Sequence, residues 1–343
     1  MYVIAQEFSL PGDKRFSRRG FVAACRLEEF GKGSVYPHEK TLAKPKEDRF
    51  RLFQATHAMF SQIFCLFPDP VNFVSDYLNF VMTASPIFDV EFENTHTRMW
   101  SVKDDSIVLS IAEFMKHQRV LVADGHHRYE TAIMYKDAER LRNPHHTGKE
   151  PYNFVPVFFT SMNDPGLIIL PTHRLLHSMN GFQQGDFLRQ VGEIFDVNVV
   201  ESPAILLKRL TDTSSISFGL LLPEEPYCVF LSLNGKGRIK VSHLPPVVSQ
   251  LDVTILHRLI FQEMLGMSPE AQEKKLYLEY VKEIADAKEA VRSGRAQAAF
   301  LMNATRIEQV RAVAEAGLVM PQKSTYFYPK LLSGTVIYSF KDE

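Results

Sequence analysis

Short apolar runs and helix-like periodicities alternate along the first half of the chain. Val120–Ala123 is an apolar run that is too short for a helix and ends in turn residues, which predicts a buried strand. After Asp124-Gly125, apolar residues recur at helical spacing and predict a helix from about His127 to Leu141. Phe88–Phe92 alternates apolar and acidic residues, which predicts a strand with one wet face. This half therefore mixes strands and helices.

The second half shows the same mixture. Its pattern predicts strands over Ser217–Leu222, Tyr227–Leu233 and Arg238–His243. The last two flank Asn234-Gly235-Lys236-Gly237, a strong hairpin signal. A helix is expected over Lys275–Arg292.

Thr305 with Glu308 forms a capping-box pattern that opens another helix. The polar loop Asn143–Gly148 is the best place for a domain boundary, since about 100–200 residues form one domain. We therefore expect two domains, 1–148 and 149–343. Because strands and helices alternate without a strict βαβ order, the predicted fold class is α+β, that is, mixed α/β.

Charge and composition exclude several classes of protein. The chain has 39 Lys and Arg residues against 40 Asp and Glu residues, a net charge of −1, which makes nucleic acid an unlikely partner. No apolar run reaches the roughly 18 residues that a membrane-spanning helix needs, and the N-terminus lacks signal-peptide order. Cys25, Cys65 and Cys228 form no CxxC pair, which fits a reducing cytoplasm. The sequence predicts no particular oligomeric state.

The densest chemical signal is the run Asp124 to Thr131, at a strand-to-helix turn. Gly125 allows a tight turn and close approach of a ligand, and the helix behind it offers free N–H groups to an anion such as phosphate. Arg128 can bind phosphate oxygens in a bidentate manner. Asp124 can bind Mg²⁺, but it can equally be a helix N-cap, and Arg128 a salt-bridge partner. Two adjacent histidines, His126 and His127, are hard to explain by packing alone.

A second signal is Tyr36–Thr41. Glu39, which stands beside His38 after a glycine-containing loop, is a candidate general base. The pair is not an HExxH motif, so a zincin is excluded, and an exposed charged loop explains the segment equally well. In the charged run that follows, Arg49 can reach a phosphate.

A third signal lies near the C-terminus. Pro321–Lys330 crowds polar donors and aromatic residues into ten positions. One interpretation is an extended edge strand with its aromatic residues packed inward. The other is a lining for a phosphate or an amino acid, with charge from Lys323 and Lys330 and hydroxyl groups from Ser324 and Thr325.

Together these segments resemble one family, the domain of unknown function 1015. Its hallmarks are a Pro-His-Glu-x-Thr loop, an Ala-Asp-Gly-His-His-Arg-Tyr-Glu-Thr-Ala turn, a Leu-Pro-Thr-His-Arg step and a Pro-Gln-Lys-Ser-Thr-Tyr-Phe-Tyr-Pro-Lys stretch. They stand here at Pro37–Thr41, Ala123–Ala132, Leu170–Arg174 and Pro321–Lys330. The Pro-Pro-Tyr-Asp segment that family members usually carry is absent from this sequence.

A more distant resemblance links the chain to free L-serine kinases of the ParB/sulfiredoxin type, which carry Pro-His-Glu and Asp-Gly-His-His-Arg. They make O-phospho-L-serine from L-serine and ADP or ATP. The resemblance implies a ParB/sulfiredoxin-like nucleotide-binding domain in 1–148, with a helical insertion between the two motifs. The second α+β domain would return its C-terminal strand to the site.

The resemblance also implies roles for individual residues. Glu39 would be the base and Asp124 would lie near Mg²⁺. The nucleotide would be held by Gly125, His126, His127 and Arg128. Substrate or supporting contacts would come from His38, Thr41, Arg49, Lys323, Ser324, Thr325 and Lys330.

Three functions follow from these residues. The leading one is a small-molecule kinase with Mg²⁺ and either ATP or ADP, because phosphoryl transfer needs positioning, charge neutralisation and a proton acceptor. Common kinase folds are excluded, since neither a Walker A motif nor GxGxxG is present. The alternatives are a non-catalytic ParB-like regulator that binds nucleotide or DNA, and a metal-dependent hydrolase. The hydrolase would use Asp124, Glu39, His126 and His127 as ligands.

Overall fold

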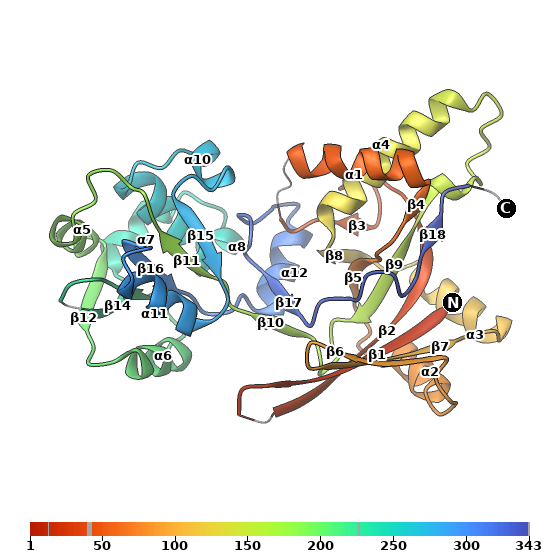
Figure 1. Cartoon of the computed structure of the whole chain (residues 1–343), viewed down its shortest axis with the longest axis horizontal. Coiled ribbons are helices and arrows are strands. Elements are labelled where there is room, and N and C mark those ends of the chain that lie inside the picture. Colours follow the sequence, from red (N-terminus) through yellow and green to blue (C-terminus); the bar gives the residue numbers. More distant parts are fainter. Residues whose placement is uncertain (13, 40–42, 226, 342–343) are drawn as a thin grey trace. The chain divides into compact units, whose positions relative to one another are not determined.

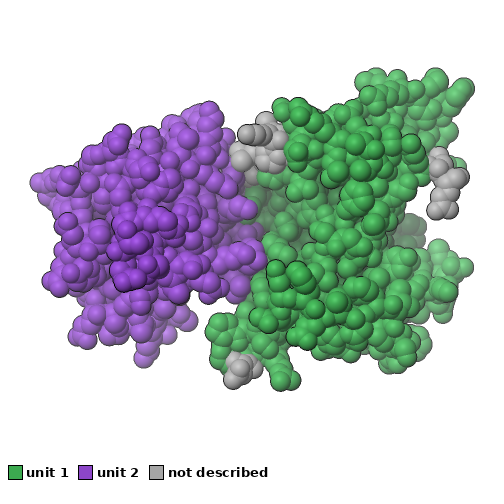
Figure 2. All heavy atoms as spheres, viewed as in Figure 1, with its two compact units in different colours: residues 1–168, 327–343 green, residues 169–326 purple. Residues whose placement is uncertain are grey.

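The chain divides into two compact units. The computed structural model describes residues 1–12, 14–39, 43–225 and 227–341. Unit 1 comprises Met1–Ile168 and Phe327–Glu343, and unit 2 comprises Ile169–Tyr326 (Figure 2). This division differs from the boundary expected after residue 148, because the strand that follows that loop joins the sheet of unit 1 and the C-terminal residues also belong there.

An eight-stranded sheet forms the centre of unit 1, in the order β3-β8-β5-β9-β2-β1-β7-β6 (Figure 1). β3 runs parallel to β8 and β5 parallel to β9, and the other neighbours are antiparallel. The strands are β1 (Tyr2–Leu10), β2 (Lys14–Arg26), β3 (Val35–Tyr36), β5 (Ile63–Phe67), β6 (Phe88–Phe92), β7 (Thr95–Ser101), β8 (Val120–Asp124) and β9 (Phe154–Ser161).

Helices cover one face of this sheet. The main core of unit 1 joins alternate strand residues, such as Val122 and Val157, with Val74, Ile111 and Tyr129 from three helices. Each such buried side chain contributes about 1.5–3 kcal/mol. The helices are α1 (Ala43–Thr56), α2 (Phe73–Val81), α3 (Asp105–Met115), α4 (His126–Arg142) and the short 3₁₀ helix η1 (Pro151–Asn153). β4 (Ala58–Met59) pairs with β18 (Tyr338–Ser339), which ties the C-terminal residues to unit 1.

Unit 2 contains a six-stranded antiparallel sheet in the order β12-β14-β13-β16-β11-β15. One of its cores packs Leu175, Ala299 and Leu301 against Leu206 and Ala290 of two helices. The strands are β11 (His173–Leu176), β12 (Phe195–Val199), β13 (Ser217–Leu221), β14 (Cys228–Leu233), β15 (Leu278–Val281) and β16 (Ala298–Leu301). β10 (Ile168–Leu170) pairs with β17 (Tyr326–Tyr328).

The helical segments of unit 2 are mostly short, and one of them is a π-helix. They are α5 (Gln184–Val191), α6 (Pro203–Asp212), α7 (Gly235–Val241), α8 (Pro246–Ser249), α9 (Asp252–Ile255), the π-helix η2 (Leu256–Met264), α10 (Pro269–Glu273), α11 (Ile284–Arg292) and α12 (Ile307–Glu315). Both units combine strands with helices, which confirms the mixed α/β fold class. The narrower expectation of a ParB/sulfiredoxin-like domain stays a prediction. Within the described ranges, no helix has the length and apolar character to cross a membrane.

The hairpin expected at Asn234–Gly237 is wrong. Asn234 is instead the N-cap of α7, because its side chain accepts a hydrogen bond from the Gly237 N–H over 3.0 Å. Gly237 is needed there, since a Cβ at this position would lie 2.5 Å from the Ile194 carbonyl oxygen. The same Asn-Gly pair that favours a hairpin thus opens a helix.

Two further local expectations are wrong. Residues 275–292 do not form one helix, because β15 pairs with β11 before α11 begins at Ile284. The helix expected to open at Thr305 has Arg306 as its N-cap, and the Arg306 N–H donates to Gln309 Oε1 over 2.9 Å, so Thr305 and Glu308 do not form a capping box. In the first case, pairing with β11 replaces the first part of the predicted helix by a strand. In the second case, the helix begins one residue later than the pattern predicted.

Candidate functional site

β3 carries the His38-Glu39 segment alongside the end of β8. Val35 and Tyr36 pair in parallel with Val120 and Leu121. Two residues further on, His38 Nδ1 lies 2.6 Å from the Val122 carbonyl oxygen. A carbonyl oxygen only accepts, so His38 carries its proton on Nδ1 and donates it to the backbone. Parallel pairing therefore brings two sequence motifs that are far apart in the chain to the same end of the sheet.

His126 joins this segment to the start of α4. The His38 main-chain N–H donates to Nε2 of His126 over 3.3 Å, and the two ring centroids are 4.7 Å apart. Because Nε2 accepts, a neutral His126 has its proton on Nδ1. Burial, followed by the proximity of His38, lowers the pKa of His126 well below its ordinary value. Burial also lowers the pKa of His38. Both imidazoles are therefore neutral near pH 7 and fix the geometry of the site.

Gly125 makes the turn between β8 and α4. Its φ of 95° is in the left-handed region, which other residues rarely adopt. A Cβ here would also lie 3.0 Å from Nη2 of Arg128. Gly125 is the N-cap of α4 and has no side chain to cap the first helical N–H groups. A 17-residue helix therefore presents its N-terminal N–H groups at this turn, which favours an anion.

Asp124 is the carboxylate of the site. Its Oδ1 accepts from the Gly125 N–H over 2.8 Å, and its Oδ2 lies 3.2 Å from Lys330 Nζ and 3.8 Å from Arg128 Nη2. Burial alone would raise the pKa of Asp124, but Lys330 and Arg128 outweigh it and lower the pKa to about 2. Asp124 is therefore ionised at every pH at which the protein would be assayed.

Arg128 and Arg49 add positive charge beside this carboxylate. Arg128 donates from Nη1 to the Gln62 carbonyl oxygen over 2.5 Å, which fixes its guanidinium beside the turn. Its pKa is lowered first by burial and also by the charge of Arg49, while Asp124 acts in the opposite direction. The exposed Arg49 on α1 therefore adds to the positive potential at Arg128.

Glu39 lies at the edge of this cluster. Its Oε1 is 3.8 Å from Nε2 of His38, and its side chain is mostly covered, at 17% exposure. A carboxylate has the chemistry of a general base, which accepts a proton from a ligand hydroxyl.

Lys330 is held in place by a buried arginine that the sequence analysis missed. Arg18 on β2 has no exposed surface and packs 4.8 Å from the centroid of Phe64. Its guanidinium donates to the Pro329 carbonyl oxygen over 2.6 Å and to that of Tyr328 over 3.4 Å. Gln6, which also bonds Arg18, donates to the Lys330 carbonyl oxygen over 3.2 Å.

Burial lowers the pKa of Arg18 to about 9, with Asp164 and Asp124 acting in the opposite direction, so it stays charged at neutral pH. In the sequence, Arg18 stands within the charged run Lys14–Arg19, which gives no sign of burial. The sequence could have indicated the burial of Arg18 only through a hairpin of the first two strands, in which Arg18 pairs with Gln6.

The remaining predicted residues are divided between the units. Lys323, Ser324 and Thr325 belong to unit 2, whereas Lys330 belongs to unit 1. Ser324 is buried, and its hydroxyl donates to the Pro321 carbonyl oxygen over 2.5 Å, which is a structural contact. Thr41 lies outside the described residues. His127 is in the first turn of α4, and its carbonyl oxygen accepts from the Thr131 hydroxyl over 2.6 Å.

The side chains of the site fit Mg²⁺ rather than a metal that is held by several protein ligands. Among the described residues, no group of three or more His, Cys, Asp or Glu side chains is arranged to hold an ion. His38 Nδ1 and His126 Nε2 are engaged with main-chain groups. Mg²⁺ is commonly held by one or two carboxylates together with substrate phosphates and water, and an ionised Asp124 beside an anion site fits that pattern. The hydrolase alternative, with four side-chain ligands, finds no such support.

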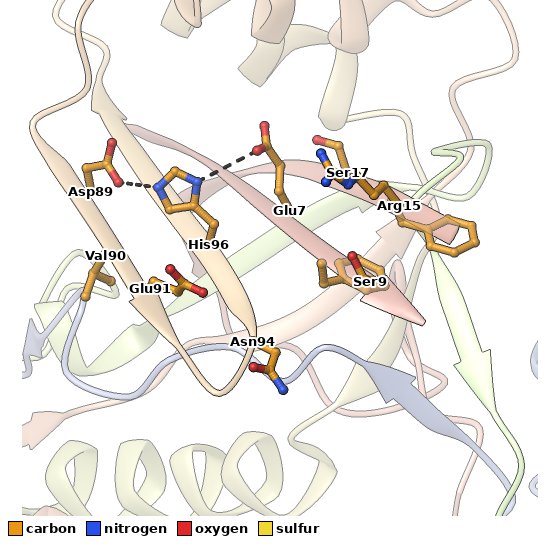
Figure 3. Close-up of a pocket in the computed structure, with 11 residues that line it drawn as sticks. Glu7, Ser9, Arg15, Ser17, Asp89, Val90, Glu91, Asn94 and His96 are labelled. Carbon is orange, nitrogen blue, oxygen red and sulfur yellow. Dashed lines mark hydrogen bonds and ion pairs between the residues drawn. The ribbon is translucent and has the colours of Figure 1, made fainter. Parts of the chain in front are cut away.

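A hollow of about 680 Å³ lies elsewhere on unit 1, over β1, β2, β6 and β7 (Figure 3). There His96 lies between Glu7 and Asp89 and contacts both carboxylates (Figure 3). Glu7 pairs with His96 across the strands, whereas its neighbour Gln6 pairs with Arg18. Adjacent residues of a strand point to opposite faces, so this hollow is on the other face of the sheet from the Arg18 network. It contains none of the predicted site residues.

Comparison with known proteins gives a family and distant likenesses. The model of the family described as "Protein of unknown function (DUF1015)" matches residues 1–254. No curated protein matches the chain.

Several solved structures resemble it at low identity. A conserved hypothetical protein from Pyrococcus furiosus is 13% identical, with 94% of this chain and 95% of that chain covered and a TM-score of 0.46. Free serine kinase in complex with AMP is 14% identical, with 90% and 86% covered and a TM-score of 0.44. SbnI with a C-terminal truncation, from Staphylococcus aureus, is 10% identical, with 91% and 85% covered and a TM-score of 0.44. At these values the likenesses carry no argument about function.

Proposed function

This chain belongs to the DUF1015 family of proteins of unknown function, and we propose that it is a small-molecule kinase. It would transfer a phosphoryl group from ATP or ADP to the hydroxyl group of free L-serine or of a similar metabolite. One observation carries the proposal: Asp124, Arg128 and Lys330 lie together at the N-terminus of α4, where His126 also contacts the segment that carries Glu39. An anion site, a carboxylate and a proton acceptor are the parts that phosphoryl transfer requires.

The phosphates of the donor would be bound at the turn around Gly125. The N-terminal N–H groups of α4 supply hydrogen bonds without a net charge, and Arg128 and Lys330 supply two cations. Arg49 adds a third positive charge nearby. His126 and His127 occupy the first turn of the same helix, and neutral His126 contributes by fixing the turn rather than by charge.

Mg²⁺ would be held by Asp124 together with the phosphates of the nucleotide. When bound, the ion would neutralise negative charge on the phosphates. Asp124 suits this role because its pKa of about 2 keeps it ionised. Lys330, which pairs with the same carboxylate, would hold its position relative to the anion.

Glu39 would accept the proton of the substrate hydroxyl. The hydroxyl oxygen would bond to the terminal phosphorus as the bond between that phosphorus and the bridging oxygen of the donor breaks, which leaves ADP from ATP or AMP from ADP. The proton would pass to the Glu39 carboxylate. His38 orients this segment through the Val122 carbonyl group. Thr41, Lys323, Ser324 and Thr325 stay predicted substrate contacts, and a cytoplasmic location agrees with three free cysteines.

The test is product formation by the full chain. Protein with Mg²⁺, L-serine and either ATP or ADP is expected to form O-phospho-L-serine, measured by mass spectrometry. Glu39→Gln is expected to lower the rate by roughly 10²–10⁴-fold, the usual contribution of a general base. Glu47→Gln makes the same chemical change at an exposed position of α1 and should keep the rate. Unchanged turnover in Glu39→Gln would remove Glu39 from its role. No phosphorylated product with any hydroxy amino acid tested would reject the kinase.

A further inference from the structure

Two cationic side chains lie over one tyrosine ring in unit 2, and a third cationic residue is hydrogen-bonded to one of them. Arg174 of β11 pairs directly across from Tyr280 of β15, and its guanidinium carbon lies 5.5 Å from the centre of the tyrosine ring. Lys275 Nζ lies 5.7 Å from the centre of the same ring. Arg174 also donates from Nη2 to the Lys323 carbonyl oxygen over 3.0 Å. These four residues, all in unit 2, are called the Arg174 cluster.

Both lysines of the Arg174 cluster have a rare backbone conformation. Lys275 has a φ of 56° and Lys323 a φ of 58°. A lysine in the left-handed region costs free energy that glycine or asparagine would largely avoid. Lys275 adopts it directly after the C-cap of α10, where the N–H groups of Lys275 and Leu276 bond the carbonyl oxygens of Gln272 and Ala271 and end the helix. The conformation of Lys275 therefore has a structural cause, and the case for a ligand depends on the position and charge of the cluster.

The charges of the Arg174 cluster repel one another. Burial, followed by the charge of Lys323, lowers the pKa of Lys275, so the two ammonium groups lie within electrostatic range. In the part of the chain that the structure describes, neither lysine forms an ion pair, and both are exposed. The nearby Glu279 pairs with Arg295, and as the neighbour of Tyr280 on β15 it points to the opposite face of the sheet. Positive charge is thus concentrated where a soluble ligand can reach it.

We propose that the Arg174 cluster binds a phosphate group of a small molecule. The ammonium groups of Lys275 and Lys323 contact its oxygens, and Arg174 fixes the main chain of Lys323 while adding to the positive potential. A phosphate dianion matches several converging cations better than a single carboxylate does. The inference concerns unit 2 and goes beyond the proposed kinase, whose donor phosphates and proton acceptor are assigned to residues of unit 1.

The experiment measures inorganic phosphate binding to the full chain by isothermal titration calorimetry, with sodium chloride at equal ionic strength as the reference. Lys275→Asn and Lys323→Asn remove one ammonium group each, and asparagine tolerates the left-handed backbone. Each is expected to weaken phosphate binding at unit 2 by about tenfold, the loss of one charge-assisted contact. Lys274→Asn, at the exposed residue next to Lys275, is the matched control and should bind as the unmodified chain does.

A second measurement excludes unfolding and the anion site of unit 1. Lys323→Asn relieves backbone strain, so its melting temperature should stay the same or rise while phosphate binding weakens. Arg128→Gln weakens the anion site at Gly125 and should leave the phosphate binding that depends on Lys275. The proposal is overturned if the chain binds no phosphate, if Lys274→Asn weakens binding equally, or if only Arg128→Gln does. None of these readouts requires nucleotide or turnover, so the kinase proposal can fail while this one stands.

Discussion

Each unit buries one arginine that holds the main chain of the C-terminal segment beside a lysine. In unit 1, Arg18 is 0% exposed and binds the carbonyl oxygens of Tyr328 and Pro329, next to Lys330. In unit 2, Arg174 is 2% exposed and binds the carbonyl oxygen of Lys323. A guanidinium group is suited to holding a main-chain segment, because it has several N–H donors, can hydrogen-bond two carbonyl groups at once and keeps its charge.

The two lysines differ in the charge of the groups near them. Lys330 Nζ lies 3.2 Å from Asp124 Oδ2, so the cluster of unit 1 contains its own counter-charge. Lys323 has Lys275 as its charged neighbour, so the cluster of unit 2 has an excess of positive charge. Under the two proposals, the buried arginines support two kinds of site. The site in unit 1 would have its charges balanced before a ligand arrives, whereas the site in unit 2 would be completed by an anion.

The largest expected effect is on Arg18. Arg18→Met would leave Gln6 and the carbonyl groups of Tyr328 and Pro329 without their donor inside the protein. Breaking a buried charged network of this kind costs about 3–5 kcal/mol, so the free energy of unfolding should fall by roughly that amount. Urea denaturation followed by circular dichroism measures it. Arg15→Met, at an exposed position of the same strand, should change stability by less than about 0.5 kcal/mol.

A loss below about 1 kcal/mol in Arg18→Met would show that the C-terminal segment is held by other contacts. The comparison between the two buried arginines would then fail, since Arg18 would not be needed to position the C-terminal segment of unit 1. If instead the loss is large and the residual folded protein forms no O-phospho-L-serine, the arginine acts through the position of Lys330.

An intermediate effect is expected at Asp252 of unit 2, whose pKa is raised, whereas that of Asp124 in unit 1 is lowered. Burial raises the pKa of Asp252 to about 7, against a smaller opposite effect of Arg306. Between about pH 4 and pH 7 the folded state therefore binds the proton more tightly than the unfolded state, and stability falls as pH rises through that window. The full shift would correspond to about 4 kcal/mol. Because Asp252 keeps part of its surface exposed, Asp252→Asn should remove about half of this cost and raise the free energy of unfolding at pH 8 by about 2 kcal/mol, with no gain at pH 4.

Urea titrations of both proteins at pH 4 and pH 8 measure this difference, and subtracting one protein from the other cancels the titration of the buried histidines. Asp286→Asn is the matched control, because Asp286 is an exposed aspartate in the first turn of another helix of unit 2. An equal gain at both pH values would assign the effect to helix capping rather than to the buried charge.

The sequence predicted the central strand and helix of the site, and the reason is local. Val120–Ala123 is apolar throughout and ends at Asp124-Gly125, and the spacing of Tyr129 and Ala132 describes one helical face. A strand-turn-helix unit of this kind depends on neighbours in the chain, so periodicity and turn chemistry suffice. The mixed α/β class followed from the same reasoning.

What the sequence did not provide were contacts between distant segments. Arg18 is 310 residues from Tyr328, and nothing in a charged run on a strand indicates that one arginine of it is buried. Asn234-Gly235 favours a hairpin locally, but a helix forms because Asn234 caps it. β15 was missed because its pairing with β11 overrides the helical pattern around Lys275. The boundary between the compact units differs from the one expected after residue 148 for the same reason, since β9 pairs with the distant β2.

The smallest expected effect is on the ion pair that distinguishes the two units. The side chains of Lys330 and Asp124 are 43% and 39% exposed, and exposed pairs contribute about 0.2–1 kcal/mol. A double-mutant cycle with Lys330→Met and Asp124→Asn should give a coupling energy in that range, which decreases as salt is added. Lys149→Met in place of Lys330→Met should show no coupling. A coupling above about 2 kcal/mol that resists salt would make the pair a structural element of unit 1. Charge balance would then stabilise the fold itself, and the contrast with the unbalanced lysines of unit 2 would concern folding rather than ligand binding.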